Sequence, residues 1–369
     1  MNLPLNTAVI GCGGMGCGFI KAVLAEPKLH LSAVCDRSSA ALARAGEIAP
    51  QARQVRDSAA IFADPAISVV VLATLADARP ALVRAALAAG KHVIAEKPLA
   101  ATVAEEESLL GAIEASGLVV AVNIFNRNAW YHRLILDFIA SGEIGDLAVV
   151  RVRHQTPGML PGGGHEPEGP PFHDCGMHYV DVARWYAGAE YASWHAQGVC
   201  LWDHAVPWWI NAHGTFANGV VFDITQGFIH GHLAEKTSIS CGLEAIGTRG
   251  VAWYSHDFNL VDVHLRGVSK TVDQTGPYGG KKLDVMVDRV AQAILTGQDT
   301  GYPKARDSVI ASRVSQHMLD AARYGAPMRG TAHELGLIRR RQAEQRSADA
   351  ARAAAEAKSE AAQAAKAAT

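Results

Sequence analysis

The segment Ala8-Val9-Ile10-Gly11-Cys12-Gly13-Gly14-Met15-Gly16 decides the fold of the N-terminal half. It joins a short apolar strand to a GxGxxG turn, and an apolar helical pattern follows as far as Glu26. A second apolar run ends at Asp36, twenty residues after Gly16. A glycine-rich turn alone is a weak signal. Between a strand and a helix, with an acidic residue at this distance, it is typical of a dinucleotide-binding βαβ unit.

Each glycine has a separate expected role in this unit. Gly11 permits the tight turn, Gly13 lets the backbone approach a pyrophosphate, and Gly16 lets the helix pack closely on the strand. The N–H groups of residues 13–16 and the positive end of the helix are expected to hold the phosphates.

The residues that end the second strand bear on the choice of dinucleotide. Asp36 is placed to accept hydrogen bonds from a ribose 2′-OH, and its charge would repel a 2′-phosphate. Arg37 weakens this preference for NAD, because a guanidinium can pair with a phosphate or stack on adenine. The sequence therefore favours NAD as the cofactor over NADP.

The first 125 residues alternate β-branched runs with Ala- and Leu-rich helical stretches. The strand-like runs are Thr7–Ile10, Leu29–Cys35, Val69–Thr74, His92–Ala95 and Leu118–Ile124. Short apolar strands separated by helices favour right-handed βαβ crossovers and a buried parallel sheet. Residues 1–125 are therefore predicted to form an α/β Rossmann domain with a doubly wound parallel sheet, which binds NAD.

After about residue 145, strand-like runs follow one another directly, which favours an antiparallel sheet. These runs are Leu147–Gln155, Ser193–Leu201, Ile210–Phe216, Gly219–Gln226, Thr237–Ile246 and Asn259–Arg266. One helix is expected at Gly176–Ala187. Two more, near Lys281–Leu295 and Lys304–Tyr324, are expected to close this α+β substrate domain, residues 126–335.

The C-terminal stretch has no residues that could form a core. After Ile338 there is no Leu, Ile, Val, Met or aromatic residue, while Ala alternates with charged side chains and Gln. Alanine favours helix, but no apolar stripe is present to bury. Residues 336–369 are therefore predicted to be a solvated helix or a disordered tail.

The composition of the 369 residues excludes several classes of protein. A formal charge of −2 without a long basic run argues against nucleic-acid binding. No apolar stretch reaches the ~18 residues of a spanning helix, and no signal peptide is evident, so no membrane partner is expected. Six cysteines without a CxxC pair favour reduced thiols and a cytoplasmic protein.

Lys97 ends a predicted parallel strand, at the sheet edge where open α/β folds bind ligands. A lysine beside a nicotinamide ring could exchange a proton with a substrate hydroxyl if its pKa were depressed. A solvated lysine before Pro98 is an equally good interpretation of the spacing alone.

Several ordered motifs resemble the Gfo/Idh/MocA oxidoreductases, the family of glucose-fructose oxidoreductase and inositol dehydrogenase. They are the glycine turn with Asp36, Glu96-Lys97-Pro98 and the block Ser141–Leu147. The resemblance covers roughly residues 5–330. It implies that Lys97 assists catalysis, often ahead of a cis proline bond, and that the second domain is an open, mainly antiparallel sheet. It also implies that this sheet often carries an oligomer interface, so we expect a homodimer or homotetramer.

The family's DxGxH signature matches Asp174-Cys175-Gly176-Met177-His178, which implies that Lys97, Asp174 and His178 form the catalytic group. His178 lies four positions after Asp174, so the two side chains can share one helix face. The carboxylate could then orient the imidazole, which makes His178 a credible base. The alternatives are a core histidine satisfied by Asp181 or by the backbone, and an Asp174 that acts mainly as a helix N-cap or as a substrate ligand.

The sequence departs from the family pattern after the third predicted strand. Where the family has a Thr/Ser-Pro-Asn-like turn and a nearby His, this chain has Leu75 for the proline and Arg79 for the His. Thr74 can still face the cofactor, and we include it with Glu96 and Lys97 among the cofactor contacts. The sequence does not determine which residues contact the nicotinamide.

The polar loop Pro157–Pro171 precedes the signature and contains His165 and Glu166. We interpret it as a substrate loop and expect no metal, although His, Asp and Glu side chains could bind a divalent ion. The substrate-binding candidates are Lys97, Arg127, His165, Asp174 and His178. Tryptophans 194, 202, 208 and 209 could stack on a sugar, but at least two of them are expected in the core.

The leading hypothesis is an NAD-dependent dehydrogenase acting on a secondary hydroxyl of a sugar, glycoside or cyclitol. One alternative is a redox-assisted glycosidase that retains its NAD and releases the aglycone without net NADH. Another is a non-catalytic regulator that senses a dinucleotide, against which the presence of both Lys97 and His178 argues.

Overall fold

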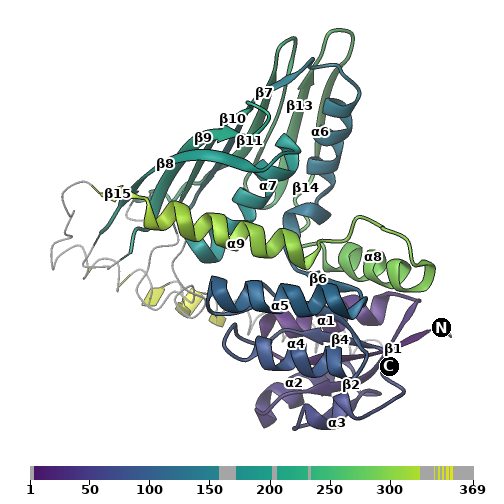
Figure 1. Ribbon diagram of the computed structural model, residues 1–369. Helices are drawn as coiled ribbons and strands as arrows, with labels where there is room; N and C mark the ends of the chain where they lie inside the picture. Colours follow the sequence, from purple (N-terminus) through teal and green to yellow (C-terminus); the bar gives the residue numbers. More distant parts are fainter. Residues whose placement is uncertain are drawn as a thin grey trace, which may run out of the picture.

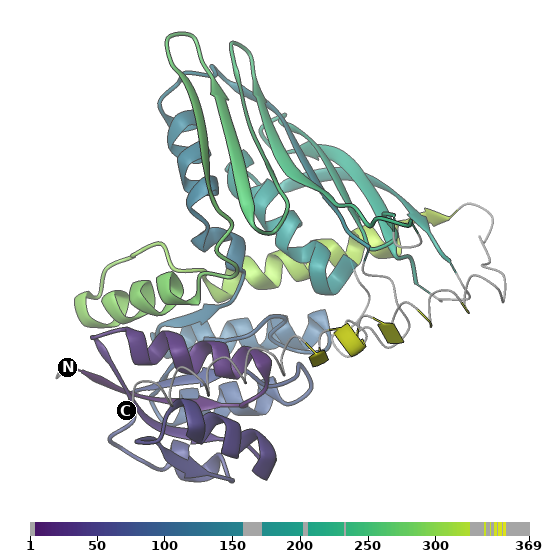
Figure 2. The ribbon, with the colours of Figure 1, turned by 180° about the vertical axis from the view of Figure 1, so that it is seen from behind.

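The computed structural model describes residues 4–157, 172–201, 206–231 and 234–324. It also describes positions 336, 340, 343–344, 346–348 and 350–351. Two sheets organise these residues, one above the other, with helices between them (Figure 1). The same two layers are seen from behind in Figure 2.

The N-terminal sheet has six parallel strands in the order β3-β2-β1-β4-β5-β6. The strands are β1 Leu5–Ile10, β2 Leu29–Cys35, β3 Arg53–Val55, β4 Val69–Leu72, β5 His92–Ala95 and β6 Val120–Val122. The helices are α1 Gly14–Ala25, α2 Ser39–Ile48, α3 Ala59–Phe62, α4 Arg79–Ala88 and α5 Val103–Ser116. The predicted Rossmann fold is confirmed. Only the short edge strand β3 was not predicted, because Arg53 and Gln54 are exposed and polar.

The second sheet has nine strands in the order β14-β13-β12-β11-β7-β10-β9-β8-β15. They are β7 Leu147–Gln155, β8 Tyr191–Val199, β9 Trp209–Phe216, β10 Val221–Gly227, β11 Ser240–Gly247, β12 Val251–His256, β13 Leu260–Arg266, β14 Thr271–Pro277 and β15 Arg323–Tyr324. All neighbours are antiparallel except β7 with β10 and β8 with β15. The predicted, mainly antiparallel sheet is confirmed, with β12, β14 and β15 as additions.

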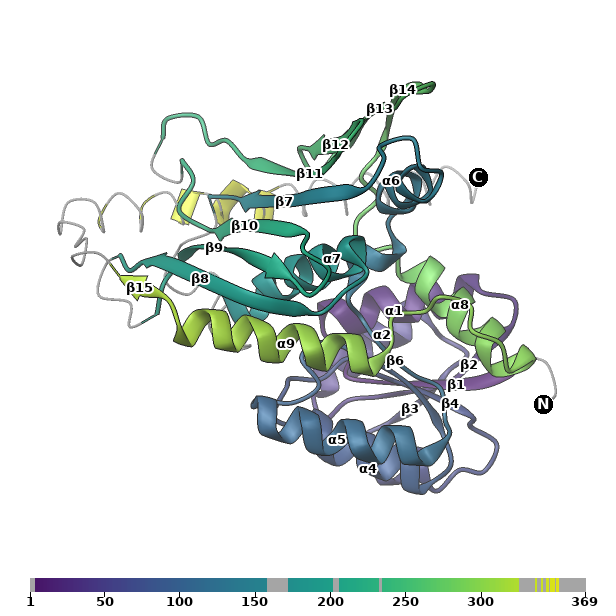
Figure 3. The ribbon, with the colours of Figure 1, turned by 45° about the horizontal axis from the view of Figure 1, so that its top comes forward.

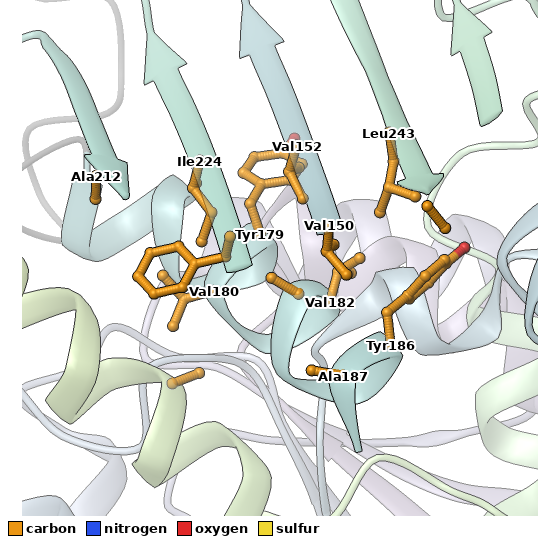
Figure 4. Packing of buried hydrophobic residues seen from close by; sticks show 14 of the residues in the cluster. Val150, Val152, Tyr179, Val180, Val182, Tyr186, Ala187, Ala212, Ile224 and Leu243 are labelled. Atoms are coloured by element: carbon orange, nitrogen blue, oxygen red, sulfur yellow. The ribbon is translucent and has the colours of Figure 1, made fainter. Parts of the chain in front are cut away.

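Helices cover one face of this sheet (Figure 3): α6 Trp130–Ala140, α7 Met177–Ala187 and α9 Ala305–Asp320. Along β7, Val150 and Val152 are buried while Arg151 and Arg153 are exposed, so the alternation of the sequence selects the covered face. Figure 4 shows the valines against α7, whose Tyr179 and other apolar side chains point toward the strands. This packing fixes α7, which carries His178, relative to the sheet.

The C-terminal helices join the two sheets. The helix α8 Leu283–Thr296 was expected to close the second domain, but its Met286 and Val290 pack in the same cluster as Phe19 of α1. The amphipathic stripe of α8 thus covers an apolar face of the Rossmann domain. Just before α9, the carbonyl of Pro303 accepts a hydrogen bond from the Val122 amide of β6 at 3.0 Å.

A buried ion-pair network fixes α7 to its neighbours. Arg127 follows β6 in the short helix η1 Phe125–Asn128, and it donates from Nε and Nη2 to the two carboxylate oxygens of Asp181, at 2.8 and 2.7 Å. Its Nη1 lies 3.1 Å from Asp307 of α9. The Asp181 side chain is 0% exposed. All three guanidinium nitrogens of Arg127 are therefore engaged, and the residue joins η1 to α7 and α9.

Other expectations can be compared with the described residues. All six cysteines are free thiols. Over the ranges that the structure describes, no helix is both long and apolar enough to cross a bilayer. The predicted tail lies almost wholly outside the described residues.

Substituting Asn for Asp181 tests the buried network. Because it removes one charge of a buried pair while Asp307 remains close to Arg127, we expect the free energy of unfolding to fall by about 3 kcal/mol. The matched control is Glu107→Gln, which breaks the exposed 3.2 Å pair with Arg313 and should change stability by less than about 1 kcal/mol. Urea denaturation measures both variants, and equal losses would contradict the assigned role.

Candidate functional site

A cavity of about 990 Å³ lies at the carboxyl ends of the parallel strands. The Rossmann domain contributes the glycine turn and the ends of β2, β4 and β5 to its wall. The chain after β6 contributes Phe125, Asp174, Cys175, His178 and Lys281. The cavity therefore lies between the two domains, where open α/β sheets bind ligands.

The glycine turn has the close contacts that its sequence predicts. Gly11 has φ +90°, and a Cβ there would lie 2.5 Å from the Ala73 carbonyl oxygen. A Cβ on Gly16 would lie 1.9 Å from the carbonyl oxygen of Gly11. By contrast, a Cβ on Gly13 or Gly14 would meet nothing within 4 Å, and both residues line the cavity. Gly11 and Gly16 thus shape the turn, whereas Gly13 and Gly14 face open space.

Asp36 is fixed by backbone amides at the end of β2. Its Oδ2 accepts from the Cys12 N–H at 2.7 Å, and its Oδ1 accepts from the Ser38 N–H at 2.8 Å. Arg37 also lines the cavity, as does Arg56, which the sequence analysis did not select. Arg56 donates to the Arg37 carbonyl at 2.8 Å. One carboxylate and two guanidinium side chains therefore lie at this part of the cavity wall.

The turn after β4 shows how the chain accommodates its departures from the family pattern. Thr74 lines the cavity, and its buried Oγ1 has no hydrogen-bond partner in the part of the chain that the structure describes. Leu75 is 55% exposed. Arg79 is buried, and its guanidinium donates to the carbonyl oxygens of Thr74 and Pro98. The arginine that replaces the expected His therefore ties this turn to the loop that follows Lys97.

The loop after β5 is held from two sides. The Lys97–Pro98 peptide is cis, as the resemblance implied. Arg79 binds the Pro98 carbonyl, and Glu106 of α5 accepts from the Leu99 N–H at 2.8 Å. Burial raises the pKa of the Glu106 carboxyl to about 7. Arg79 and Glu106 thereby restrict where Lys97 can lie.

Lys97 and Asp174 meet across the domain boundary. The Lys97 ammonium forms an ion pair with the Asp174 carboxylate and also donates to the Asp174 carbonyl oxygen at 3.2 Å. Both side chains are largely buried, with 12% and 7% exposed. Asp174 lies in a π-helical turn, Phe172–Gly176, directly before α7. Its carboxylate therefore contacts the Rossmann domain. The N-cap residue of α7 is Gly176, so Asp174 does not cap this helix.

His178 lines the cavity from the first turn of α7. Phe125 packs against its ring at 4.6 Å, and the buried Nδ1 has no hydrogen-bond partner among the described residues. Asp181 is occupied by Arg127, so it does not satisfy His178. Burial, together with the positive charges of Lys97 and Lys281, lowers the pKa of His178 well below 6.5. The imidazole is therefore neutral at physiological pH and can accept a proton.

The structure does not bring every predicted site residue to the cavity. Arg127 is absent from the lining and is engaged with Asp181 and Asp307 instead. His165 lies outside the described residues, as do Glu166 and Trp202. Trp208 is buried against Phe228, as expected of a core tryptophan. Within the described ranges, no group of three His, Cys, Asp or Glu side chains is arranged to bind a metal ion.

Lys281 is a cavity residue that the sequence analysis missed. It follows Gly279 and Gly280 in the connection between β14 and α8. A Gly-Gly-Lys-Lys run after a strand is the only local signal, and such runs are common in surface turns.

Comparison with known proteins agrees with this geometry. A protein-family model described as an oxidoreductase family with an NAD-binding Rossmann fold matches residues 5–124. A second, for the Gfo/Idh/MocA C-terminal domain, matches residues 132–253. The chain belongs to the Gfo/Idh/MocA family. The resemblance inferred from the motifs is thereby confirmed.

Individual relatives are more distant. Inositol 2-dehydrogenase 2 of Saccharopolyspora erythraea is 30% identical over 193 residues, which are 51% of this chain and 55% of the relative. The chain thus spans about half the length of this curated relative.

Solved structures share the fold over most of their length. A 3-ketoreductase from Actinomadura kijaniata in complex with NADP and TDP-benzene has a TM-score of 0.73 at 23% identity, covering 89% of this chain and 100% of that chain. An oxidoreductase from Agrobacterium radiobacter in complex with NAD+, L-tartaric acid and magnesium has a TM-score of 0.75 at 19% identity, covering 86% and 96%. At these identities the likeness concerns the fold alone.

The cavity of this Gfo/Idh/MocA protein fits a dinucleotide on its own geometry. The open space at Gly13 and Gly14 adjoins the N-terminus of α1, whose amides can bind phosphate. Asp36 lies at one part of the wall, and the unpartnered Thr74 Oγ1 at another. Lys97, Asp174 and His178 line the same cavity. These residues would hold a dinucleotide cofactor.

The glycine turn predicts two separable phenotypes. Gly16→Ala should destabilise the protein by at least about 1–3 kcal/mol, because its methyl group would overlap the Gly11 carbonyl. Gly13→Ala should change stability by less than about 0.5 kcal/mol. It should nonetheless weaken NAD+ binding at least about tenfold, a loss of ~1.4 kcal/mol, because its methyl group enters the cavity.

Urea denaturation and calorimetric titration with NAD+ measure the two effects. Unchanged NAD+ binding in Gly13→Ala would contradict the placement of the phosphates beside this residue.

Proposed function

We propose that the protein is an NAD-dependent dehydrogenase that oxidises a secondary hydroxyl of a sugar, glycoside or cyclitol. One observation carries the proposal: Lys97, Asp174 and His178 converge in the wall of the dinucleotide cavity. A cation, an anion that fixes it and a neutral base are the groups that alcohol oxidation needs.

The proposed division of roles follows from the contacts of each side chain. Asp174 holds the Lys97 ammonium, which donates a hydrogen bond to the substrate hydroxyl oxygen and stabilises its alkoxide character. His178, which is neutral and whose Nδ1 has no partner among the described residues, accepts the hydroxyl proton. A nicotinamide held beside these residues would supply the hydride acceptor that the conversion of the same carbon to a carbonyl requires. In this arrangement Asp174 orients Lys97, whereas the sequence analysis expected it to orient His178.

The preference for NAD over NADP is part of the proposal and rests on Asp36. Two backbone amides fix its carboxylate, so it cannot easily turn away from a 2′-phosphate. Arg37 and Arg56 oppose this preference, because both line the cavity. We expect the fixed carboxylate to dominate, since its oxygens can accept both ribose hydroxyl protons without moving.

A homodimer or homotetramer is proposed as the assembly. Arg151 and Arg153 alternate with the buried valines of β7, so they lie on the sheet face opposite α7.

The dehydrogenase activity is tested by following NADH at 340 nm with a panel of sugars, glycosides and inositols, with NAD+ and NADP+ in parallel. With a substrate found, Lys97→Met should lower kcat about 10²–10⁴-fold, because the hydroxyl loses its hydrogen-bond donor. Lys304→Met, which removes an exposed charge paired with Asp299, is the matched control and should retain activity.

Absence of any signal with either cofactor across the panel would contradict the proposal. Release of an aglycone without accumulation of NADH would favour the redox-assisted glycosidase instead.

The pH profile tests the role of His178. The neutral imidazole is the active form, so kcat/KM for oxidation should fall as pH decreases through its pKa. Because that pKa is lowered, the midpoint of the acidic limb should lie below pH 6.5. His178→Gln should remove this limb while the binding of NAD+ is retained. A limb centred above pH 7 in the parent enzyme, or one that persists in the variant, would exclude His178 as the base.

A further inference from the structure

We propose that Lys281, supplied by the second domain, binds the pyrophosphate of the dinucleotide beside the glycine turn. This inference rests on the proposed dinucleotide-dependent function and adds a residue to its cofactor site.

The backbone of the connection between β14 and α8 has an unusual shape. Gly279 and Gly280 have φ values of +69° and +62°, and Lys282 has φ +49° although it is not glycine. A left-handed conformation costs such a residue about 1–2 kcal/mol, so the surrounding structure must hold it. Between these positions, Lys281 reaches the cavity wall.

The next lysine has a different environment. A Cβ on Gly279 would lie 2.3 Å from Cε and 2.6 Å from Nζ of Lys282, so the Lys282 side chain folds back over its own turn. Lys282 does not line the cavity. Two adjacent lysines thus carry the same charge, but only Lys281 presents it to the ligand space.

The Lys281 ammonium lies against the glycine turn, with no anionic partner among the described residues. Its Nζ is 3.2 Å from the Met15 Sδ, a weak acceptor. Within the described part of the chain, no carboxylate or carbonyl oxygen accepts a hydrogen bond from it. The lysines at positions 28, 97 and 304, in contrast, each pair with a carboxylate. An ammonium that faces a ligand cavity with only a thioether contact can readily take a phosphate oxygen.

The position of Met15 indicates which ligand oxygen the ammonium meets. Met15 belongs to the first turn of α1, directly after the glycines whose open side faces the cavity. The turn Gly11–Gly16 contains no basic residue, so it offers the phosphates backbone N–H groups and the helix dipole alone. A pyrophosphate carries two negative charges, and Lys281 would supply the full positive charge that the turn lacks.

Calorimetric titration with ADP-ribose and with NAD+ tests this inference on the full chain. ADP-ribose contains the pyrophosphate but no nicotinamide. We expect Lys281→Met to weaken both ligands about 10- to 100-fold, as for a lost charge-assisted hydrogen bond. Lys281→Arg should restore affinity to within about threefold, because it keeps the charge. Lys282→Met, the matched control, should bind both ligands as the parent does.

The possible outcomes separate this inference from the proposed function. If the parent protein binds neither NAD+, NADP+ nor ADP-ribose, the proposed function fails. If the parent binds them and Lys281→Met binds ADP-ribose equally well, the inference about Lys281 is wrong and the proposed function stands.

If Lys281→Met loses affinity for NAD+ but not for ADP-ribose, Lys281 lies at the nicotinamide and the pyrophosphate assignment is wrong. A loss seen only in the KM of an acidic substrate would assign the lysine to that substrate and overturn it equally. Urea denaturation of each variant checks that it remains folded under the conditions of the titration.

Discussion

The ion pair between Lys97 and Asp174 is the interaction on which the site depends. The two residues are 77 positions apart, and their contact brings the loop after β5 to the turn before α7. Removing both charges from water is costly, and the pair is stable only when packing and further hydrogen bonds compensate. The geometry of the cavity therefore depends on the elements behind the pair.

Those elements hold each partner separately. On the Rossmann side, Arg79 and Glu106 bind the backbone at Pro98 and Leu99. On the other side, His173, next to Asp174, contacts the Ser312 hydroxyl of α9 at 2.7 Å. Burial lowers the pKa of His173, so this contact involves a neutral imidazole. Because α9 packs on both α5 and α7, the two sets of contacts share one support.

Most of the fold could be predicted from periodicity. The run Val69–Leu72 is buried at every position, and β7 alternates valine with arginine, so each sequence pattern matches one kind of sheet. The position of α8 could not be predicted in this way. Its apolar stripe indicates that one face is buried, but only the tertiary structure shows that α1 covers it.

The candidate site was predictable where a motif specifies backbone geometry. The glycine turn and Lys97 lie at the cavity as expected, whereas the spacing of Asp174 and His178 suggested a direct interaction. The π-helical turn before α7 and the ion pair with Lys97 give Asp174 a different partner. Lys281 was missed because a lysine in a turn between a strand and a helix has no periodic pattern that marks it.

The polar groups in the cavity fall into two classes that reflect how a folded chain treats unsatisfied atoms. Lys97, Asp36 and Arg79 hydrogen-bond within the protein, and their positions are fixed before any ligand enters. Among the described residues, Thr74 Oγ1 and His178 Nδ1 have no partner, and Lys281 has only a thioether. Leaving a buried polar atom unpaired costs about 1–3 kcal/mol. A ligand in this cavity would supply the missing partners, so the fixed groups define the shape of the site and the unpaired ones are the groups left to contact a ligand.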